Sequence, residues 1–314
     1  MNRTLLSYIE LDDANLAKLT RYADVYTRSS QGFEDAKQRA EVVLCITLGK
    51  QDVLKMKNLR FIQVLSAGVD ALPWNDIPEN VLVCGNMGSN ADAVAEHTWA
   101  LILALAKRLH HYLPKVRSGD FKRDLMLLQL KGKSLCVVGM GSIGRRVAEV
   151  GKAFGMRVYG VTRSGQSPLA VEKIVTPDKL DEVLRESDVV VLTAPLTKFT
   201  KNMIGLDRLR LLRKDCILVN VGRAELIDRE ALLAYLRENP EAMVATDVWW
   251  NVVSDGPWES ELTKYPRFIG TPWIAGAFGS PEVLKQMIDQ AVENITRYFR
   301  GEKPLNIVDR TEYV

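Results

Sequence analysis

The sequence contains little of what marks a disulfide-bonded or metal-binding protein. Its 314 residues include only four cysteines and three histidines, and no two cysteines form a CxxC pair. This spacing does not match a disulfide framework or a zinc site. We therefore expect Cys45, Cys84, Cys136 and Cys216 to be free thiols, three of them buried in apolar runs. No metal is expected.

Long apolar segments and an excess of one charge are also missing. The longest purely apolar run, residues 99–106, is far below the roughly 18–20 residues that cross a bilayer. The first ten residues reach an acidic residue before an apolar stretch develops, unlike a signal peptide. Lysine and arginine total 42 against 39 acidic residues, a net charge of +3. This balance gives no reason to expect nucleic acid or a membrane as partner, and we expect a cytoplasmic protein.

Short β-rich runs instead alternate with helical patterns along the whole chain. This alternation is typical of parallel sheets covered by helices on both faces. Because a domain usually has roughly 100–200 residues, a chain of 314 residues is expected to form two domains. The strands predicted in the first series are Leu5–Ile9, Asp24–Thr27, Val42–Thr47, Phe61–Leu65 and Val81–Cys84. Those predicted in the second are Leu135–Val138, Arg157–Thr162, Val189–Thr193, Ile217–Asn220, Met243–Asp247 and Arg267–Ile269.

Helical patterns connect these strands and join the two series. One long helix is predicted over Ala91–Tyr112, ending before Pro114, and a last helix over Pro281–Arg300. Asp228 is a plausible N-cap for the helix that follows it. We therefore predict an α/β protein built from two doubly wound parallel-sheet domains.

One motif at the start of the second series predicts dinucleotide binding. It has the form G-x-G-x-x-G and consists of Gly139, Met140, Gly141, Ser142, Ile143 and Gly144. The pattern alone is weak, but here it follows a strand and opens a helix, which is the context that makes it credible. The glycines allow a tight turn, close approach of the pyrophosphate and close packing of helix on strand. The helix N-terminus offers free N–H groups and a positive dipole end to the phosphates.

The end of the next strand predicts which dinucleotide is bound. NAD enzymes place an acidic residue about 20 residues after the loop to bind the ribose 2′-hydroxyl. Here the strand ends in Thr162, Arg163 and Ser164, with no carboxylate. A guanidinium suits a 2′-phosphate, so NADP is favoured, with NAD still possible if Arg163 is only a solvated surface residue.

Six further motifs complete a recognisable set. They are Leu65–Asp70 (LSAGVD), Asn90 with residues 94–97 (VAEH), residues 193–197 (TAPLT) with Thr200, Asn220–Arg223 (NVGR), Asp247-Val248 and Thr271-Pro272. With the phosphate loop, they make the chain resemble the D-isomer-specific 2-hydroxyacid dehydrogenase family, which includes glyoxylate and hydroxypyruvate reductases, phosphoglycerate dehydrogenase and formate dehydrogenase. The resemblance implies a Rossmann dinucleotide-binding domain, residues 89–274, inserted in a flavodoxin-like substrate domain, residues 1–88 and 275–314. It also implies a homodimer built on the dinucleotide-binding domain and the long helix.

The resemblance further implies roles for individual residues toward a small carboxylate substrate. Backbone amides around Ser66, Ala67 and Gly68 would hold the substrate carboxylate, and Arg223 would grip it and polarise the carbonyl. Asp247 would bind near the nicotinamide. The residues implied to line the cofactor cleft are Thr193, Ala194, Pro195, Thr200, Val221 and Gly222.

The family pattern breaks at its proton donor. That donor is a histidine directly after Thr-Pro, paired with a glutamate five residues beyond the strand-ending aspartate. Here the two positions hold Trp273 and Val252, and an indole N–H does not donate a proton near neutral pH. Trp273 would then only line the substrate pocket. His97 could supply the proton instead, or a water held by Ser66, Asn90 or Arg223.

Three functions remain open on the sequence. The first is an NADP(H)-preferring reductase of small 2-oxoacids with an altered proton path. The second is a dinucleotide-binding sensor or scaffold that has lost the chemistry. The third is oxidation of a donor such as formate, in which no alkoxide needs a proton. The retained Arg223, Asp247 and Ser66–Gly68 loop favour the first.

Overall fold

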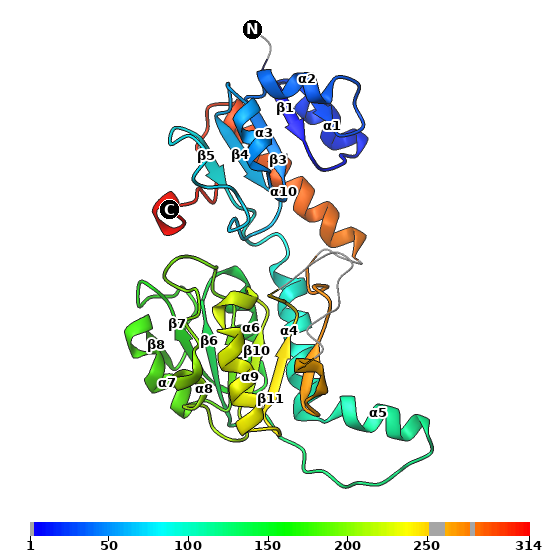
Figure 1. Cartoon of the computed structure of the whole chain (residues 1–314), viewed down its shortest axis with the longest axis vertical. Coiled ribbons are helices and arrows are strands. Elements are labelled where there is room, and N and C mark those ends of the chain that lie inside the picture. The colour runs from blue at the N-terminus through cyan, green and yellow to red at the C-terminus, as the bar shows by residue number, and fades with distance from the viewer. Residues whose placement is uncertain (1–2, 251–260, 277–279) are drawn as a thin grey trace. The chain divides into compact units, whose positions relative to one another are not determined.

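Two compact units make up the chain in a computed structural model, which describes residues 3–250, 261–276 and 280–314 (Figure 1). The first unit comprises Met1–Asn90 and Gly279–Val314, and the second comprises Ala91–Phe278. The first unit is therefore discontinuous in sequence, and the second is inserted within it.

The first unit is built on a parallel five-stranded sheet. Its strands are β1 (Thr4–Ser7), β2 (Asp24–Thr27), β3 (Val42–Cys45), β4 (Phe61–Val64) and β5 (Leu82–Cys84). Their order is β2-β1-β3-β4-β5, which is the flavodoxin-like doubly wound order and confirms the predicted fold. Its helices are α1 (Asp13–Leu19), α2 (Phe33–Ala36), α3 (Lys50–Lys55) and α10 (Pro281–Phe299).

Buried amides join α10 to the sheet, although α10 comes from the other end of the chain. Asn294 Nδ2 donates to Gln63 Oε1 at 2.7 Å, and both side chains are buried. Asn86 Nδ2 donates to the carbonyls of Leu65 and Met287, at 2.9 and 2.8 Å. Because buried polar groups must be paired, these bonds set the position of α10 and of the segment that follows β4.

The second unit is built on a parallel seven-stranded sheet with the order β12-β11-β10-β9-β6-β7-β8. Its strands are β6 (Ser134–Val138), β7 (Arg157–Val161), β8 (Lys173–Val175), β9 (Val189–Leu192), β10 (Ile217–Asn220), β11 (Met243–Thr246) and β12 (Phe268–Gly270). Read from β8, the first six strands follow the Rossmann order 3-2-1-4-5-6. The Rossmann prediction is confirmed. Strand β8 is the third strand of this order and was not predicted from the sequence, and β12 extends the sheet at the other end.

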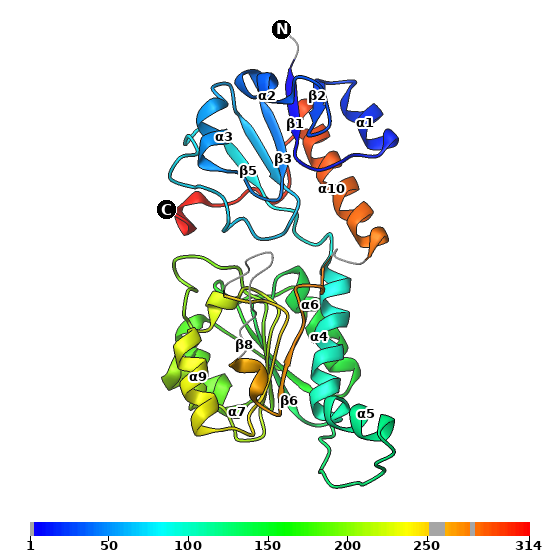
Figure 2. The same ribbon diagram turned by 45° about the vertical axis from the view of Figure 1, so that its right-hand side comes forward.

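Helices cover both faces of this sheet (Figure 2). Residues of α4 (Ala91–Ala106) and α6 (Ser142–Ala153) belong to the core on one face. Residues of α7 (Leu180–Glu186), α8 (Leu206–Leu209) and α9 (Arg229–Glu238) contribute to the core on the other. Asp228 caps α9 as predicted, since its side chain accepts a hydrogen bond from Ala231 N at 2.7 Å.

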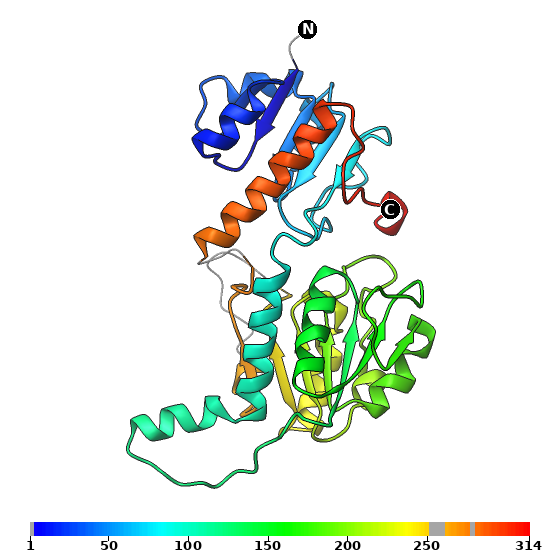
Figure 3. The ribbon, with the colours of Figure 1, turned by 180° about the vertical axis from the view of Figure 1, so that it is seen from behind.

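The single long helix predicted over Ala91–Tyr112 is wrong. The chain forms α4, then turns at Arg108, whose φ is +55°, and continues as α5 (Leu109–Arg117) with Pro114 inside it. Apolar residues recur at helical spacing across the break, so periodicity alone merges the two helices. In α5 no residue is buried, and Leu113 is 54% exposed. Figure 3 shows α5 and the segment after it leading away from the sheet.

The described residues contain no membrane-spanning helix and no metal-binding group of side chains. No helix among them is long and apolar enough to span a bilayer, and none of their histidine, cysteine and acidic side chains group as a metal site. All four cysteines are free and buried.

Candidate functional site

The glycine-rich loop follows β6 and takes the conformation that its three glycines permit. Gly139 has φ +103°, and a Cβ there would lie 2.6 Å from Ala194 N. A Cβ on Gly144 would collide with the carbonyl oxygen of Gly139 and lie 2.8 Å from Thr193 Oγ1. A Cβ on Gly141, by contrast, would meet nothing within 4 Å. The first and third glycines are thus required by packing, whereas the second leaves open space above the backbone.

The loop is also held from the neighbouring strand. Thr193, directly after β9, donates from Oγ1 to the carbonyl of Gly139 at 2.7 Å. Helix α6 begins at Ser142, so its first N–H groups lie beside the open space over Gly141. Together these features fit a dinucleotide pyrophosphate, which needs close backbone approach and free N–H donors.

The end of β7 presents the residues that would meet the ribose. Arg163 and Ser164 are exposed. Thr162 Oγ1 is buried and has no hydrogen-bond partner in the part of the chain that the structure describes. In the sequence the first carboxylate after this strand is Glu172. The residues at this strand end thus offer hydrogen bonds and positive charge, and no negative charge.

The turn after β10 is rigid. Asn220 Nδ2 donates to the carbonyl of Arg223 at 2.8 Å, and Gly222 N donates to Asn220 Oδ1 at 3.1 Å. Arg223 itself donates from Nη1 to the carbonyl of Gly222 at 3.0 Å. A Cβ on Gly222 would lie 3.0 Å from the carbonyl oxygen of Ala194. This packing brings Gly222 close to Ala194, and both residues are predicted to line the cofactor cleft.

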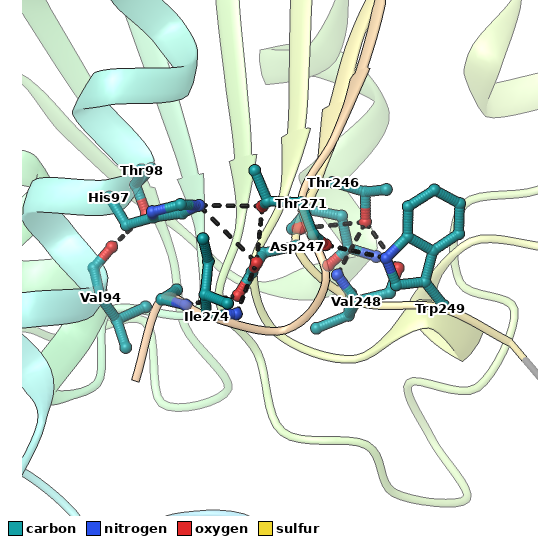
Figure 4. Close-up of polar contacts among 11 residues, drawn as sticks. Val94, His97, Thr98, Thr246, Asp247, Val248, Trp249, Thr271 and Ile274 are labelled. Atoms are coloured by element: carbon teal, nitrogen blue, oxygen red, sulfur yellow. Dashed lines mark hydrogen bonds and ion pairs between the residues drawn. The ribbon is translucent and has the colours of Figure 1, made fainter. Parts of the chain in front are cut away.

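Asp247 follows β11, the strand next to β10, and is almost completely buried, with 1% of its surface exposed. Its Oδ1 accepts from Thr271 Oγ1 at 2.6 Å and from Ile274 N at 3.0 Å, and its Oδ2 accepts from Ala275 N at 2.8 Å (Figure 4). Asp247 therefore holds the segment 271–275 that follows β12.

His97, on α4, extends this network from the opposite side (Figure 4). Its Nε2 lies 2.9 Å from Thr271 Oγ1 and 3.7 Å from Asp247 Oδ1. A hydroxyl has one proton, and Thr271 uses it for the carboxylate, so the hydroxyl oxygen must accept from His97. His97 Nε2 is therefore the donor in this hydrogen bond.

Trp273 occupies the position where the family resemblance implies the proton donor. Its φ of +57° is a left-handed conformation, which is uncommon for a bulky residue. Trp273 N and Trp249 Nε1 both donate to the carbonyl of Thr271, at 3.0 and 2.8 Å. The side chain is 41% exposed. Val252, its expected partner, lies outside the described residues.

The predicted substrate loop belongs to the first unit. Ser66 Oγ donates to the carbonyl of Gly68 at 2.8 Å, and Asn86 N donates to the carbonyl of Ser66 at 2.9 Å. A Cβ on Gly85 would lie 2.8 Å from the carbonyl oxygen of Ala67, so only glycine fits behind the loop. The Oδ1 atom of Asn90 is buried and lacks a hydrogen-bond partner in the described residues.

Some residues that shape the site were not singled out from the sequence. Thr271 appeared only as part of a motif, yet its hydroxyl joins His97 to Asp247. Asn220 and Asn86 fix the turns that present Arg223 and the Ser66–Gly68 loop. An asparagine at the end of a strand is a signal for such a turn. Thr200 has a similar structural role, since its Oγ1 donates to the carbonyl of Pro195 at 2.7 Å.

Comparison with known proteins agrees with this geometry. Residues 99–275 match the family model described as D-isomer specific 2-hydroxyacid dehydrogenase, NAD binding domain. The chain is 36% identical over 263 residues to a glyoxylate reductase of Aeropyrum pernix, covering 80% of this chain and 77% of that protein. It is 30% identical over 321 residues to a glyoxylate reductase of Thermofilum pendens, covering 96% and 92%. Among solved structures, a putative formate dehydrogenase of Pyrobaculum aerophilum superposes with a TM-score of 0.88 at 36% identity, over 99% of this chain and 100% of that one.

Proposed function

The chain belongs to the D-isomer-specific 2-hydroxyacid dehydrogenase family, and we propose that it reduces a small 2-oxoacid to the 2-hydroxyacid with NADP(H) as the preferred cofactor. Family membership makes it an oxidoreductase of CH–OH groups that uses a nicotinamide dinucleotide. The choice of 2-oxoacid and of NADP(H) is our proposal. The observation that carries it is the placement of Arg223 and Asp247 at the carboxyl ends of adjacent strands, in the same sheet as the glycine loop.

Arg223 is proposed as the residue that binds the substrate carboxylate. Its guanidinium offers paired N–H donors that match a planar carboxylate, and the rigid Asn220–Arg223 turn limits the conformational entropy lost on binding. The same charge would polarise the carbonyl that is reduced. Backbone amides of Ala67 and Gly68 would donate hydrogen bonds to the oxygens of the same carboxylate. A bound dinucleotide supplies the hydride.

Asp247 is proposed to orient the nicotinamide, with Thr271 and His97 as the residues that position Asp247. Among the described residues, Oδ2 of Asp247 accepts only from Ala275 N, so it retains capacity for an amide N–H of the cofactor. Thr271 fixes the other oxygen, and His97 fixes Thr271. Because the proton on Nε2 is used by this chain of bonds, any proton that His97 delivers to the reaction leaves from Nδ1.

The preference for NADP(H) rests on the end of β7. Arg163 would pair with the 2′-phosphate, and the hydroxyls of Thr162 and Ser164 would complete its hydrogen bonds. Since no carboxylate stands there, NADH would bind without its usual ribose contact. We therefore propose a preference, with NADH as the weaker cofactor.

A homodimer through the second unit is also proposed. The arm formed by α5 and the segment after it exposes apolar side chains that include Leu113, Phe121 and Met126, which are 54%, 76% and 90% exposed. Apolar side chains that gather on one exposed surface mark an interface, and a second copy of the chain is the proposed occupant. Sedimentation equilibrium of the wild type and of Phe121→Ser tests this: a monomeric wild type would contradict it.

The deciding experiment is a substrate panel run with both cofactors. Oxidation of NADPH and of NADH is measured with glyoxylate, hydroxypyruvate and pyruvate, and reduction of NADP⁺ and of NAD⁺ is measured with formate. We expect turnover of at least one 2-oxoacid, with loss of at least ~100-fold in kcat/KM in Arg223→Ala and partial activity in Arg223→Lys. Tight NADPH binding without turnover would favour a sensor or scaffold. Turnover of formate alone would favour the third function, which the name of the Pyrobaculum relative also suggests.

A double variant tests the altered proton path. Trp273→His combined with Val252→Glu restores both positions of the family's donor pair. If the missing acid limits the wild type, the double variant should turn over faster, because a positioned acid typically contributes about 10²–10⁴-fold. An unchanged rate would mean that proton supply does not limit turnover.

A further inference from the structure

A buried guanidinium lies apart from the candidate site described above. Arg108, at the break between α4 and α5, is only 7% exposed. Its Nη1 has no hydrogen-bond partner, and its side chain makes no hydrogen bond or ion pair within the described ranges 3–250, 261–276 and 280–314. A buried charge without a partner strongly destabilises a fold, and an unsatisfied buried group points to a missing water or ion.

The neighbourhood of Arg108 is positive rather than negative. The pKa of Arg108 is lowered, first by burial and then by the charge of Arg267. The pKa of His110 is also lowered, first by burial, with the charge of Arg108 contributing. The carboxylate that acts on Arg108 is that of Glu241, and it already pairs with Arg267 at 2.8 Å. The carboxylate of Glu241 is therefore engaged by Arg267 and is mostly exposed to water.

The backbone at Arg108 is held in an uncommon conformation. Its φ of +55° is left-handed, and its carbonyl accepts from both His111 N and Tyr112 N at 3.0 Å. Such conformations persist only where the surroundings fix them, and they cluster at ligand sites. The backbone that carries Arg108 is thus held in a defined turn.

We propose that Arg108, with Arg267 and His110, forms a binding site for a small anion that carries a carboxylate or phosphate group. A planar guanidinium pairs with both groups, and the bound anion would supply the missing counter-charge. Glu241 and Arg267 shortly precede β11 and β12, so this site is at the amino ends of the strands. The glycine loop, Arg223 and Asp247 are at the carboxyl ends. The site is therefore distinct from the proposed active site and independent of the proposed function.

The experiment measures the melting temperature of the full chain at constant ionic strength while chloride is replaced by inorganic phosphate or by succinate. A saturable rise of about 5–10 °C is expected when the anion reaches about a hundred times its dissociation constant. Arg108→Met should not show this rise. Without the anion, its melting temperature should equal or exceed that of the wild type, because the buried charge has been removed. Arg210→Met is the matched control. It removes an exposed arginine paired with Glu238 and should keep the rise.

Isothermal titration of the wild type and of Arg108→Lys with phosphate and succinate covers the case in which Arg108→Met fails to fold. The wild type should bind at least one of the two anions, and Arg108→Lys should bind it at least ~10-fold more weakly, because an ammonium lacks the planar fork. An equal rise in wild type and Arg108→Met would be a general salt effect and would overturn the proposal. So would the absence of binding, or a change from dimer to monomer in Arg108→Met, which would mean that the counter-charge comes from a second copy.

Discussion

The glycine loop allows packing and ligand binding to be separated by two substitutions of the same size. Gly141→Ala and Gly144→Ala each add one methyl group within the same motif. A Cβ at 141 would meet nothing within 4 Å, whereas a Cβ at 144 would collide with the carbonyl oxygen of Gly139. If the pyrophosphate binds in the open space above Gly141, Gly144→Ala should fold poorly. Gly141→Ala should fold well but bind dinucleotides weakly.

The magnitudes follow from the contacts. Gly141 has φ −72°, which alanine adopts freely, so the loss of a glycine N-cap and the gain from a less flexible unfolded chain nearly cancel, each being about 0.5–1 kcal/mol. The stability of Gly141→Ala should therefore change little. Gly144→Ala must displace backbone, and overpacking costs about 1–3 kcal/mol or more. The same steric cost, applied to a pyrophosphate above the methyl group added at position 141, corresponds to about 5–150-fold weaker binding.

Two measurements check this. Urea unfolding gives the free energy of unfolding of both variants, and titration of protein fluorescence gives the dissociation constants for NADPH and NADH. We expect Gly141→Ala to unfold like the wild type and to bind both dinucleotides more weakly by the same factor, since the pyrophosphate is common to both. Unchanged dinucleotide affinity in a stable Gly141→Ala protein would refute the placement of the pyrophosphate over this loop.

Three other predictions concern single groups. Arg163→Ala should weaken NADPH binding at least ~10-fold and leave NADH nearly unchanged; equal losses would contradict the 2′-phosphate assignment. Thr271→Val should weaken dinucleotide binding while Thr271→Ser retains it, because only the hydroxyl joins His97 to Asp247; equal affinities in both variants would show that this bond does not position the carboxylate. Burial raises the pKa of the Cys136 thiol to about 12, so a disulfide exchange reagent at about pH 8 should react only after urea unfolding. Because this folded pKa lies above the ordinary value of 9.0, the thiol ionises at a lower pH in the unfolded chain than in the folded one. Its contribution to the free energy of unfolding is therefore complete below pH 9.0 and decreases as the pH rises above it. The urea midpoint of unfolding should fall accordingly.

The fold was predictable because its determinants are local. Several strand ends in the second unit carry a motif whose context can be read in the chain, such as the glycine loop after β6 and the Asn220–Arg223 turn after β10. The break at Arg108 was not predictable, because the apolar spacing continues through it and the turn depends on bonds from His111 and Tyr112 to the carbonyl of Arg108. The short strand β8 was missed because only three residues of it pair with β7.

The residues of the candidate site came from the family resemblance, but their connections could not be predicted. Arg223 and Asp247 follow strands of one parallel sheet, at the edge where such sheets bind ligands. The bond between His97 and Thr271 joins residues 174 positions apart, and nothing in either segment signals the other. Such bonds depend on how α4 packs on the sheet, which is set by many apolar contacts at once.

The network around Asp247 also bears on position 273, where the family resemblance implies the proton donor. Asp247 bonds to Thr271, Ile274 and Ala275 through a hydroxyl and two backbone amides, and none of these bonds involves the side chain at 273. These three bonds therefore do not depend on which side chain occupies position 273. Replacing Trp273 by histidine should leave them in place, so the rates of the two proteins can be compared with the same network around Asp247.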